Sequence, residues 1–110
     1  MTTNAAHYTY RVRWSPEDNE FVATVAELPS LSWLAESQIE ALTGLIVLVE
    51  ETLADMKATG EQAPIPYADR SYSGRFMVRV PPEAHRRLAI EASEQNVSLN
   101  RLVSDRLSAV

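Results

Sequence analysis

The 110-residue sequence predicts an α+β protein made of two small units, and three observations carry this prediction. Short segments between residues 8 and 35 alternate apolar and polar residues, as half-buried strands do. A long apolar stripe with helical spacing follows between residues 37 and 59. Residues 74–110 then add one alternating segment and two short amphipathic helical patterns. The expected order is β-β-β-α in the first unit and β-α-α in the second.

The first two predicted strands form a hairpin. Residues 8–14 place aromatic residues and valine at every second position, with threonine and arginine between them. Turn formers fill residues 15–19, and residues 21–25 form the second strand. A third short strand is expected at residues 31–35. We expect the large aromatic side chains to lie in the core, with an interface role for Trp33 as an alternative; they are Tyr10, Trp14, Phe21 and Trp33.

A helix is expected to begin after Ser37 and to end at Gly60. Ser37 and Glu40 have the spacing of a capping box, and glycine is a common residue at a helix C-terminus. The apolar stripe of this helix consists of Ile39, Leu42, Ile46, Val49, Leu53 and Met56. Residues 61–73 hold proline and serine without a helical or strand period, so they are expected to form a linker.

Two further helices are expected in the second unit. Pro82 stands in the first turn of one, where the N–H that proline lacks would be unused. Asn96 suits a left-handed C-terminal residue, and Ser98 suits the N-cap of the last helix. The chain has no cysteine, no secretory signal and no apolar run that could span a membrane, so we expect a cytoplasmic protein without disulfides.

The net charge of -5 hides an asymmetry between the units. Residues 73–110 contain six arginines and four acids, which gives +2. The remainder has 10 − 6 = 4 basic and 15 − 4 = 11 acidic residues, which gives -7. An acidic body repels nucleic acid and suits a basic protein partner, although acidity also serves solubility alone.

The second unit is too small to be stable alone without a disulfide, a metal or a partner. Its single strand would also leave unpaired N–H and C=O groups along both edges. Pairing with the same strand of a second chain removes both problems and predicts a two-stranded ribbon above four helices in a C₂ homodimer. The expected dimer core consists of Phe76, Val78, Val80, Leu88, Leu102 and Val103.

The other face of this ribbon would display Arg75, Met77 and Arg79 from both chains. A two-stranded ribbon fits the major groove of DNA, where arginine contacts guanine and an apolar side chain contacts the thymine methyl group. The helix start Ser98-Leu99-Asn100 is a candidate phosphate clamp, with plain helix capping as the alternative. Arg86 and Arg87 either touch the DNA backbone or lie in solvent.

These residues carry a resemblance to a known family. The stretch from Arg75 to Pro81, a polar helix and Ser98-Leu99-Asn100 resemble a ribbon-helix-helix DNA-binding unit. The chain as a whole resembles HicB-family antitoxins with such a tail. The marks in the first unit are Tyr10 and Val12, the acidic hairpin loop, Phe21-Val22-Ala23, Glu27-Leu28-Pro29, and Glu36-Ser37 with Glu40-Ala41. Ala35 departs from the family, which usually has glycine there.

The resemblance implies a partial ribonuclease H-like fold for residues 1–60, which would bind a small basic HicA-like toxin that cleaves mRNA. It implies a linker over residues 61–73 and, over residues 74–110, a ribbon-helix-helix unit that binds the operator of its own operon. The implied protein is a type II antitoxin and autoregulator, a homodimer or a higher oligomer, with no cofactor, no catalytic or metal-binding residue and no membrane partner.

Two other functions are kept as alternatives. The first is a solitary DNA-binding regulator whose first unit senses a ligand or oligomerises; an adjacent reading frame for a small basic protein would argue against it. The second is a remnant hydrolase, which would need carboxylates clustered on strands. Glu50, Glu51 and Asp55 fit a solvated helix face better, and His7 and His85 stand alone without the partners that catalysis or metal binding needs.

Overall fold

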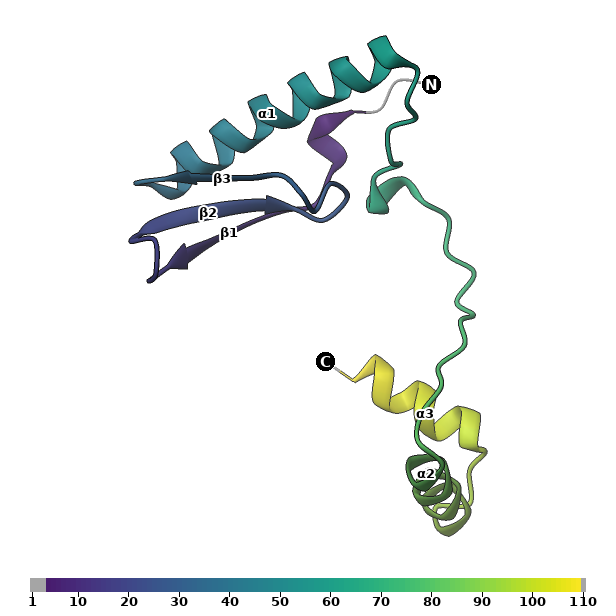
Figure 1. Ribbon diagram of the computed structural model, residues 1–110. Helices are drawn as coiled ribbons and strands as arrows, with labels where there is room; N and C mark the ends of the chain where they lie inside the picture. The colour runs from purple at the N-terminus through teal and green to yellow at the C-terminus, as the bar shows by residue number, and fades with distance from the viewer. Residues whose placement is uncertain (1–3, 110) are drawn as a thin grey trace. The chain divides into compact units, whose positions relative to one another are not determined.

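The computed structural model describes residues 4–109, and its contacts divide the chain into two compact units. The first unit is Met1–Tyr72 and the second is Ser73–Val110. A three-stranded antiparallel sheet and one long helix make up most of the first unit, and two shorter helices make up most of the second. The predicted α+β class is confirmed (Figure 1).

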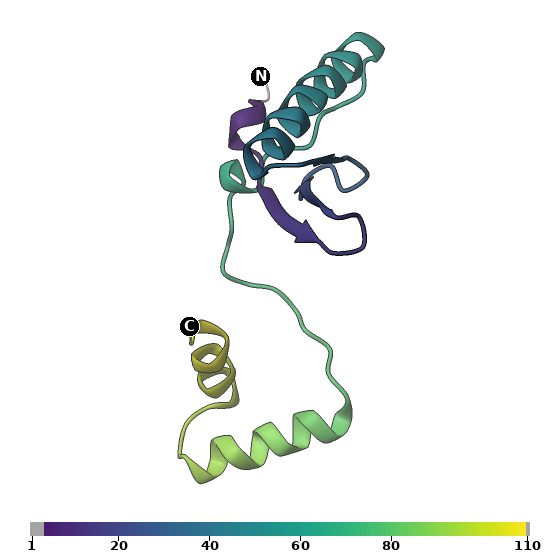
Figure 2. The ribbon, with the colours of Figure 1, turned by 90° about the vertical axis from the view of Figure 1, so that its left-hand side faces the viewer.

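The sheet of the first unit has the strand order β1-β2-β3. The strands are β1 (Tyr10–Ser15), β2 (Glu20–Val25) and β3 (Ser32–Ala35). The register pairs Ala23 with Val12 on one side and with Trp33 on the other, so these three side chains share a face. Helix α1 (Gln38–Thr59) lies across that face (Figures 1 and 2). The three predicted strands and the predicted helix are therefore confirmed, with small differences at their ends.

Both ends of α1 are fixed by the residues that the sequence indicates. The side chain of Ser37 accepts a hydrogen bond of 3.1 Å from the backbone N–H of Glu40, and Gly60 ends the helix with a φ of 79°. A positive φ suits glycine because glycine has no Cβ. Ala35 is the last residue of β3 and does not adopt a positive φ, so alanine introduces no backbone strain there.

The core of the first unit lies between α1 and the sheet. One row of α1 faces the sheet and consists of Ala41, Leu45 and Val49. The other buried members of this core are Tyr8, Ala23 and Val25. The predicted stripe is only partly correct, because Val49 faces the core whereas Ile39 is 79% exposed. Apolar residues occupy several rows of α1, so the helical period alone does not decide which row meets the sheet.

Both tryptophans are half-exposed, so their predicted placement in the core is wrong. Trp14 is 47% exposed and contacts Phe21 edge to face, with 5.0 Å between the ring centroids. Trp33 is 43% exposed, and its indole lies against Gly44 of α1, where an added Cβ would collide with the ring. Both tryptophans belong to edge strands, so neither ring has a strand on both sides to enclose it.

Residues 64–70, here called the strap, are held against the first unit. The Tyr8 hydroxyl donates a hydrogen bond to the carbonyl oxygen of Pro64 at 2.8 Å, and His7 Nδ1 lies 2.8 Å from Asp69 Oδ2. Two 3₁₀ turns meet here, η1 (Ala5–His7) and η2 (Tyr67–Asp69). The linker predicted from composition is therefore wrong for the strap. Proline-rich composition indicates that no long helix or strand forms, but it does not exclude tertiary contacts.

A buried carboxylate fastens the strap to the sheet. Glu27 is 7% exposed and accepts hydrogen bonds from the N–H of Thr9 at 2.9 Å, the N–H of Tyr67 at 3.0 Å and the hydroxyl of Thr9 at 3.1 Å. Burial by itself raises the pKa of Glu27, but these hydrogen bonds outweigh it and hold the pKa below its ordinary value. The folded first unit therefore favours the ionised side chain.

The second unit contains two helices, α2 (Pro82–Glu94) and α3 (Leu99–Ser108). Asn96 lies in the turn between them with a φ of 58°, so the predicted left-handed residue and both predicted helices are confirmed. Among the described residues of this unit, Ala92 and Leu102 are the buried apolar side chains. Two side chains make a thin core for a unit of this size.

We expect Glu27→Gln to lower the free energy of unfolding of the first unit by about 1–3 kcal/mol at neutral pH, because an amide cannot accept all three hydrogen bonds. A depressed folded-state pKa means that this contribution is present above the unfolded pKa of about 4.3 and is lost as the pH falls through the folded pKa. The difference from wild type should therefore shrink at about pH 3. Urea unfolding followed by tryptophan fluorescence measures it, since both tryptophans lie in this unit.

The matched control for this variant is Glu61→Gln, which makes the same chemical change at an exposed position just before the strap. This control should unfold like wild type at both pH values. Equal losses in the two variants, or a difference that does not depend on pH, would contradict the role given to Glu27.

We expect Gly44→Ala to displace the indole of Trp33, because the new methyl group would occupy the space of the ring. Alanine gains up to about 1 kcal/mol of helix propensity over glycine, so the variant should stay folded. In a Trp14→Phe background, in which Trp33 is the sole tryptophan, the emission should shift to longer wavelength. The control is Thr43→Ala in the same background, a change at the exposed neighbouring position that should leave the emission unchanged. If Gly44→Ala and Thr43→Ala gave similar spectra, the contact between Trp33 and Gly44 would be contradicted.

Candidate nucleic-acid interface

Residues 75–80, here called the arm, carry most of the predicted interface. The arm forms no regular secondary structure in the single chain, and the strand predicted here, which would pair with a second copy, stays a prediction. A strand needs hydrogen bonds to a neighbour, and the described part of the chain has no strand paired with the arm. Phe76 is 76% exposed and Met77 is 82% exposed, while Val78 and Val80 are exposed to a smaller degree. A single chain therefore leaves four large apolar side chains of the arm in solvent.

Both ends of the arm are fixed locally. Gly74 precedes the arm with a φ of 81°, a conformation that glycine adopts without strain. The hydroxyl of Ser73 accepts a hydrogen bond from the N–H of Arg75 at 3.1 Å. At the other end, the carbonyl oxygen of Pro81 accepts hydrogen bonds from the first amides of α2, and Pro82 occupies the first turn. The arm thus has a defined beginning and a defined end.

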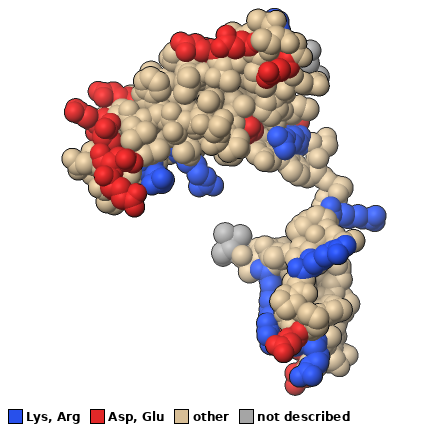
Figure 3. Space-filling model, in the orientation of Figure 1, with Lys and Arg blue, Asp and Glu red and all other residues tan. Residues whose placement is uncertain are grey.

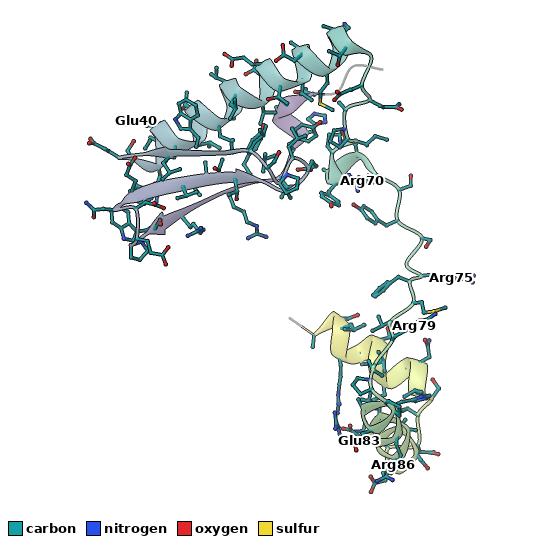
Figure 4. The ribbon with its side chains drawn as sticks, viewed as in Figure 1. Glu40, Arg70, Arg75, Arg79, Glu83 and Arg86 are labelled. Atoms are coloured by element: carbon teal, nitrogen blue, oxygen red, sulfur yellow. The ribbon has the colours of Figure 1, made fainter. Side chains whose placement is uncertain are left out.

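Four of the six arginines of the second unit have no acidic partner among the described residues. The other two do: Arg106 of α3 pairs with Glu91 of α2, and Arg101 lies 3.4 Å from Asp105 within α3. The arginines without an acidic partner are Arg75, Arg79, Arg86 and Arg87, of which Figure 4 labels the first three. Their charges can therefore act on an anionic partner, while the paired arginines stabilise the helices.

The start of α3 serves first as a helix cap. The hydroxyl of Ser98 accepts a hydrogen bond from the N–H of Arg101 at 3.0 Å, as the capping alternative predicts. Leu99 is half-buried and Asn100 is exposed. The first amides of a helix have no acceptor within it, so those of Leu99 and Asn100 can still bind an anion. The phosphate clamp stays a prediction beside the observed cap.

The apolar residues expected in a dimer core are exposed to different degrees in one chain. Leu102 is buried between the helices, whereas Leu88 and Val103 are half-buried. Ile90 and Leu107 are exposed as well, and Ile90 lies in an open groove of about 920 Å³ along α2. This groove is lined by Pro82, Glu83, Arg86, Arg87, Ile90, Glu91 and Glu94. Membership of a dimer core stays a prediction for all of these residues.

Two features of the second unit were not predicted from the sequence. Ile90 carries an exposed apolar side chain on α2, and its signal was an isoleucine outside the predicted apolar face of Ala84, Leu88 and Ala92. The ion pair between Glu91 and Arg106 joins residues 15 positions apart. No sequence pattern indicates such a pair, because it depends on the angle at which the turn around Asn96 sets the two helices.

The histidines and carboxylates form no metal-binding group within residues 4–109, since no three His, Cys, Asp or Glu side chains come together there at a suitable spacing. His7 contacts the strap, and His85 is exposed on α2. Over the same residues, none of the helices has the length and apolar character that crossing a membrane requires.

Comparison with known proteins bears on this part of the chain. The HicB family model matches residues 58–107. The match covers 50 of the 110 residues and shows that this part of the chain is similar to the HicB family, which is associated with toxin–antitoxin systems. It covers the strap, the arm and most of both helices of the second unit, but not the sheet. We found no significant match to the chain among curated proteins or among solved structures.

Proposed function

We propose that the protein is a non-catalytic antitoxin of a type II toxin–antitoxin system that acts in the cytoplasm. In this proposal the first unit, with the HicB-like residues 1–60, neutralises a small basic HicA-like toxin that cleaves mRNA. Residues 74–110 form a ribbon-helix-helix unit that binds operator DNA and represses the operon. The HicB family match supports the antitoxin role, and the two compact units are consistent with a division of the two activities.

The exposed arm is the observation that carries the DNA-binding part of the proposal. A chain that leaves Phe76, Val78 and Val80 in solvent loses the free energy of burying them, which is roughly 1.5–3 kcal/mol for a large apolar side chain. The second unit has only a thin core with which to compensate. A second copy of the arm removes both deficits, because two extended arms can exchange backbone hydrogen bonds and bury their apolar faces together.

Pairing of two arms would also place their side chains in two sets on opposite faces of the ribbon, one for the dimer core and one for DNA. In an extended arm, Phe76, Val78 and Val80 point toward the helices, and Arg75, Met77 and Arg79 point away from them. The outward set then lies twice on one face of the ribbon and fits the major groove of an operator with two-fold symmetry. The absence of acidic partners for Arg75 and Arg79 among the described residues supports this assignment.

The charge of the first unit supports a different partner. Its net charge is opposite to that of the second unit, so it repels nucleic acid and attracts basic proteins over distances of about 10 Å. A basic toxin satisfies this condition. Its attachment to the first unit leaves the arm free for DNA.

We expect Arg75→Ala/Arg79→Ala to weaken operator binding at least about hundredfold, because each bidentate arginine–guanine contact contributes about 1–3 kcal/mol and a dimer loses several. Gel-shift titration with the DNA upstream of the chain's own reading frame measures it. Neutralisation should remain, as read from growth during co-expression with the small basic protein of the adjoining reading frame. Wild-type affinity should also fall steeply between about 50 and 200 mM salt.

Arg11→Ala/Arg13→Ala is the matched control, since it removes the same charge from exposed positions of β1 in the first unit. This control should bind operator DNA like wild type. Loss of neutralisation with retained DNA binding in Arg75→Ala/Arg79→Ala, or a flat salt dependence of wild type, would contradict the proposed division of function.

We expect Phe76→Asp to convert the protein to a monomer, because the carboxylate would have to enter the apolar side of the ribbon. Met77→Asp is the control: it adds the same charge at the next residue, which has similar exposure in the single chain but points to the opposite side of the ribbon. Sedimentation equilibrium should show a dimer for Met77→Asp and a monomer for Phe76→Asp. The same oligomeric state for both variants would contradict the ribbon.

A further inference from the structure

A continuous stretch of the first unit contains only acidic charged residues. Residues 14–56 contain nine acidic residues and not one lysine, arginine or histidine. This range includes β2, β3 and nearly all of α1. Figure 3 shows acidic side chains over α1 and at the end of the sheet that holds the β1–β2 turn. Glu27 is buried in the strap contact, and the others lie at the surface. Charge complementarity therefore favours a basic partner for β3 and the start of α1.

The two edges of the sheet differ in a way that favours one of them for binding. Proteins often protect an edge strand with charged side chains, which discourage the addition of another strand. β1 carries Arg11 and Arg13 along its edge. β3 consists of Ser32, Trp33, Leu34 and Ala35 and has no charged residue. The edge of β3 pairs with no other strand among the described residues, so its backbone N–H and C=O groups can accept an extended segment.

Large apolar side chains surround this open edge. Trp33 rests on Gly44, so its ring is held in place while 43% of the residue remains exposed. Leu34 points to the face of the sheet opposite α1 and is 40% exposed. A fixed and accessible tryptophan is a typical anchor of protein interfaces, because little conformational entropy is lost when it is covered.

Two exposed carboxylates lie next to these apolar residues. Glu36 follows β3 directly, and Glu40 lies in the first turn of α1, where Figure 4 labels it. The arrangement is an apolar centre with an acidic border and a free strand edge. It combines the anchor, the charge and the backbone groups that recognition of a basic extended segment requires.

We propose that the edge of β3, with Trp33, Leu34, Glu36 and Glu40, is the docking surface for a basic protein that adds an extended segment as a fourth strand. This inference rests on the proposed antitoxin function and assigns the toxin to this edge. The segment would place an apolar side chain beside Leu34 and lysine or arginine beside the two glutamates. A second copy of the chain is a poorer occupant, because it would bring two acidic surfaces together.

The test uses the full chain and the protein encoded by the adjoining reading frame. We expect Glu36→Lys/Glu40→Lys to weaken their binding at least about tenfold, as buried and bordering charge pairs do when one partner is reversed. The matched control is Glu50→Lys/Glu51→Lys, which makes the same change in net charge about 15 Å along α1. It should weaken binding less than about threefold. Isothermal titration calorimetry measures both, after thermal unfolding has shown that both variants fold.

Hydrogen exchange of the wild-type complex gives a second readout that needs no variant. The backbone amides of residues 32–35 should become protected in the complex, whereas those of β1 should not change. Equal weakening by the two charge reversals, or no new protection in β3, would overturn the docking surface and leave the antitoxin function standing. A wild-type chain that does not bind the adjoining protein would overturn the antitoxin function together with this inference. Self-association of wild type that is lost in Glu36→Lys/Glu40→Lys would assign the edge to a second copy and also overturn it.

Discussion

The backbone N–H and C=O groups of a strand need hydrogen bonds to a neighbouring strand. This requirement determines which segments of each unit can form a sheet within a single chain. The first unit meets the requirement within one chain, since β2 pairs with a neighbour on each side and α1 covers the shared face. The arm of the second unit cannot meet it, because no strand is paired with it among the described residues. The exposed side chains of Phe76 and Val78 are the consequence, because the free energy of burying them is lost. Inside the first unit the outer edges of β1 and β3 pair with no other strand among the described residues, and β3 is the one without charged side chains.

Charge then distinguishes the partners that can meet these needs. The arm lies among arginines without acidic partners in the described structure, so two paired arms present a surface that suits a polyanion. The edge of β3 is bordered by Glu36 and Glu40 and suits a basic protein. Each surface repels the partner of the other one. The two surfaces therefore suit different partners, as the proposed function of antitoxin and repressor requires.

The sequence predicted what local interactions determine and did not predict what distant contacts determine. The caps at Ser37 and Gly60 and the left-handed turn at Asn96 depend on residues within a few positions, and all three were predicted correctly. The strap depends on Glu27, whose hydrogen bonds reach 18 residues back and 40 residues ahead, and composition gave no sign of them. The half-exposed position of Trp33 follows from the row of α1 that meets the sheet, which periodicity left open. For the candidate site, the pattern identified the arm and its arginines, but a strand there requires a second chain.

The difference between the units has a consequence for how the two proposed activities respond to concentration. The first unit has a core closed within one chain, so binding of a toxin to it does not require a second copy of the chain. The second unit gains most of its apolar burial only when two arms meet, so its stability depends on chain concentration by mass action. At low concentration a chain of this design would keep the proposed toxin-binding surface and lose the proposed DNA-binding ribbon. Repression would therefore be relieved before neutralisation fails, and renewed synthesis would begin while the remaining chains still bind toxin.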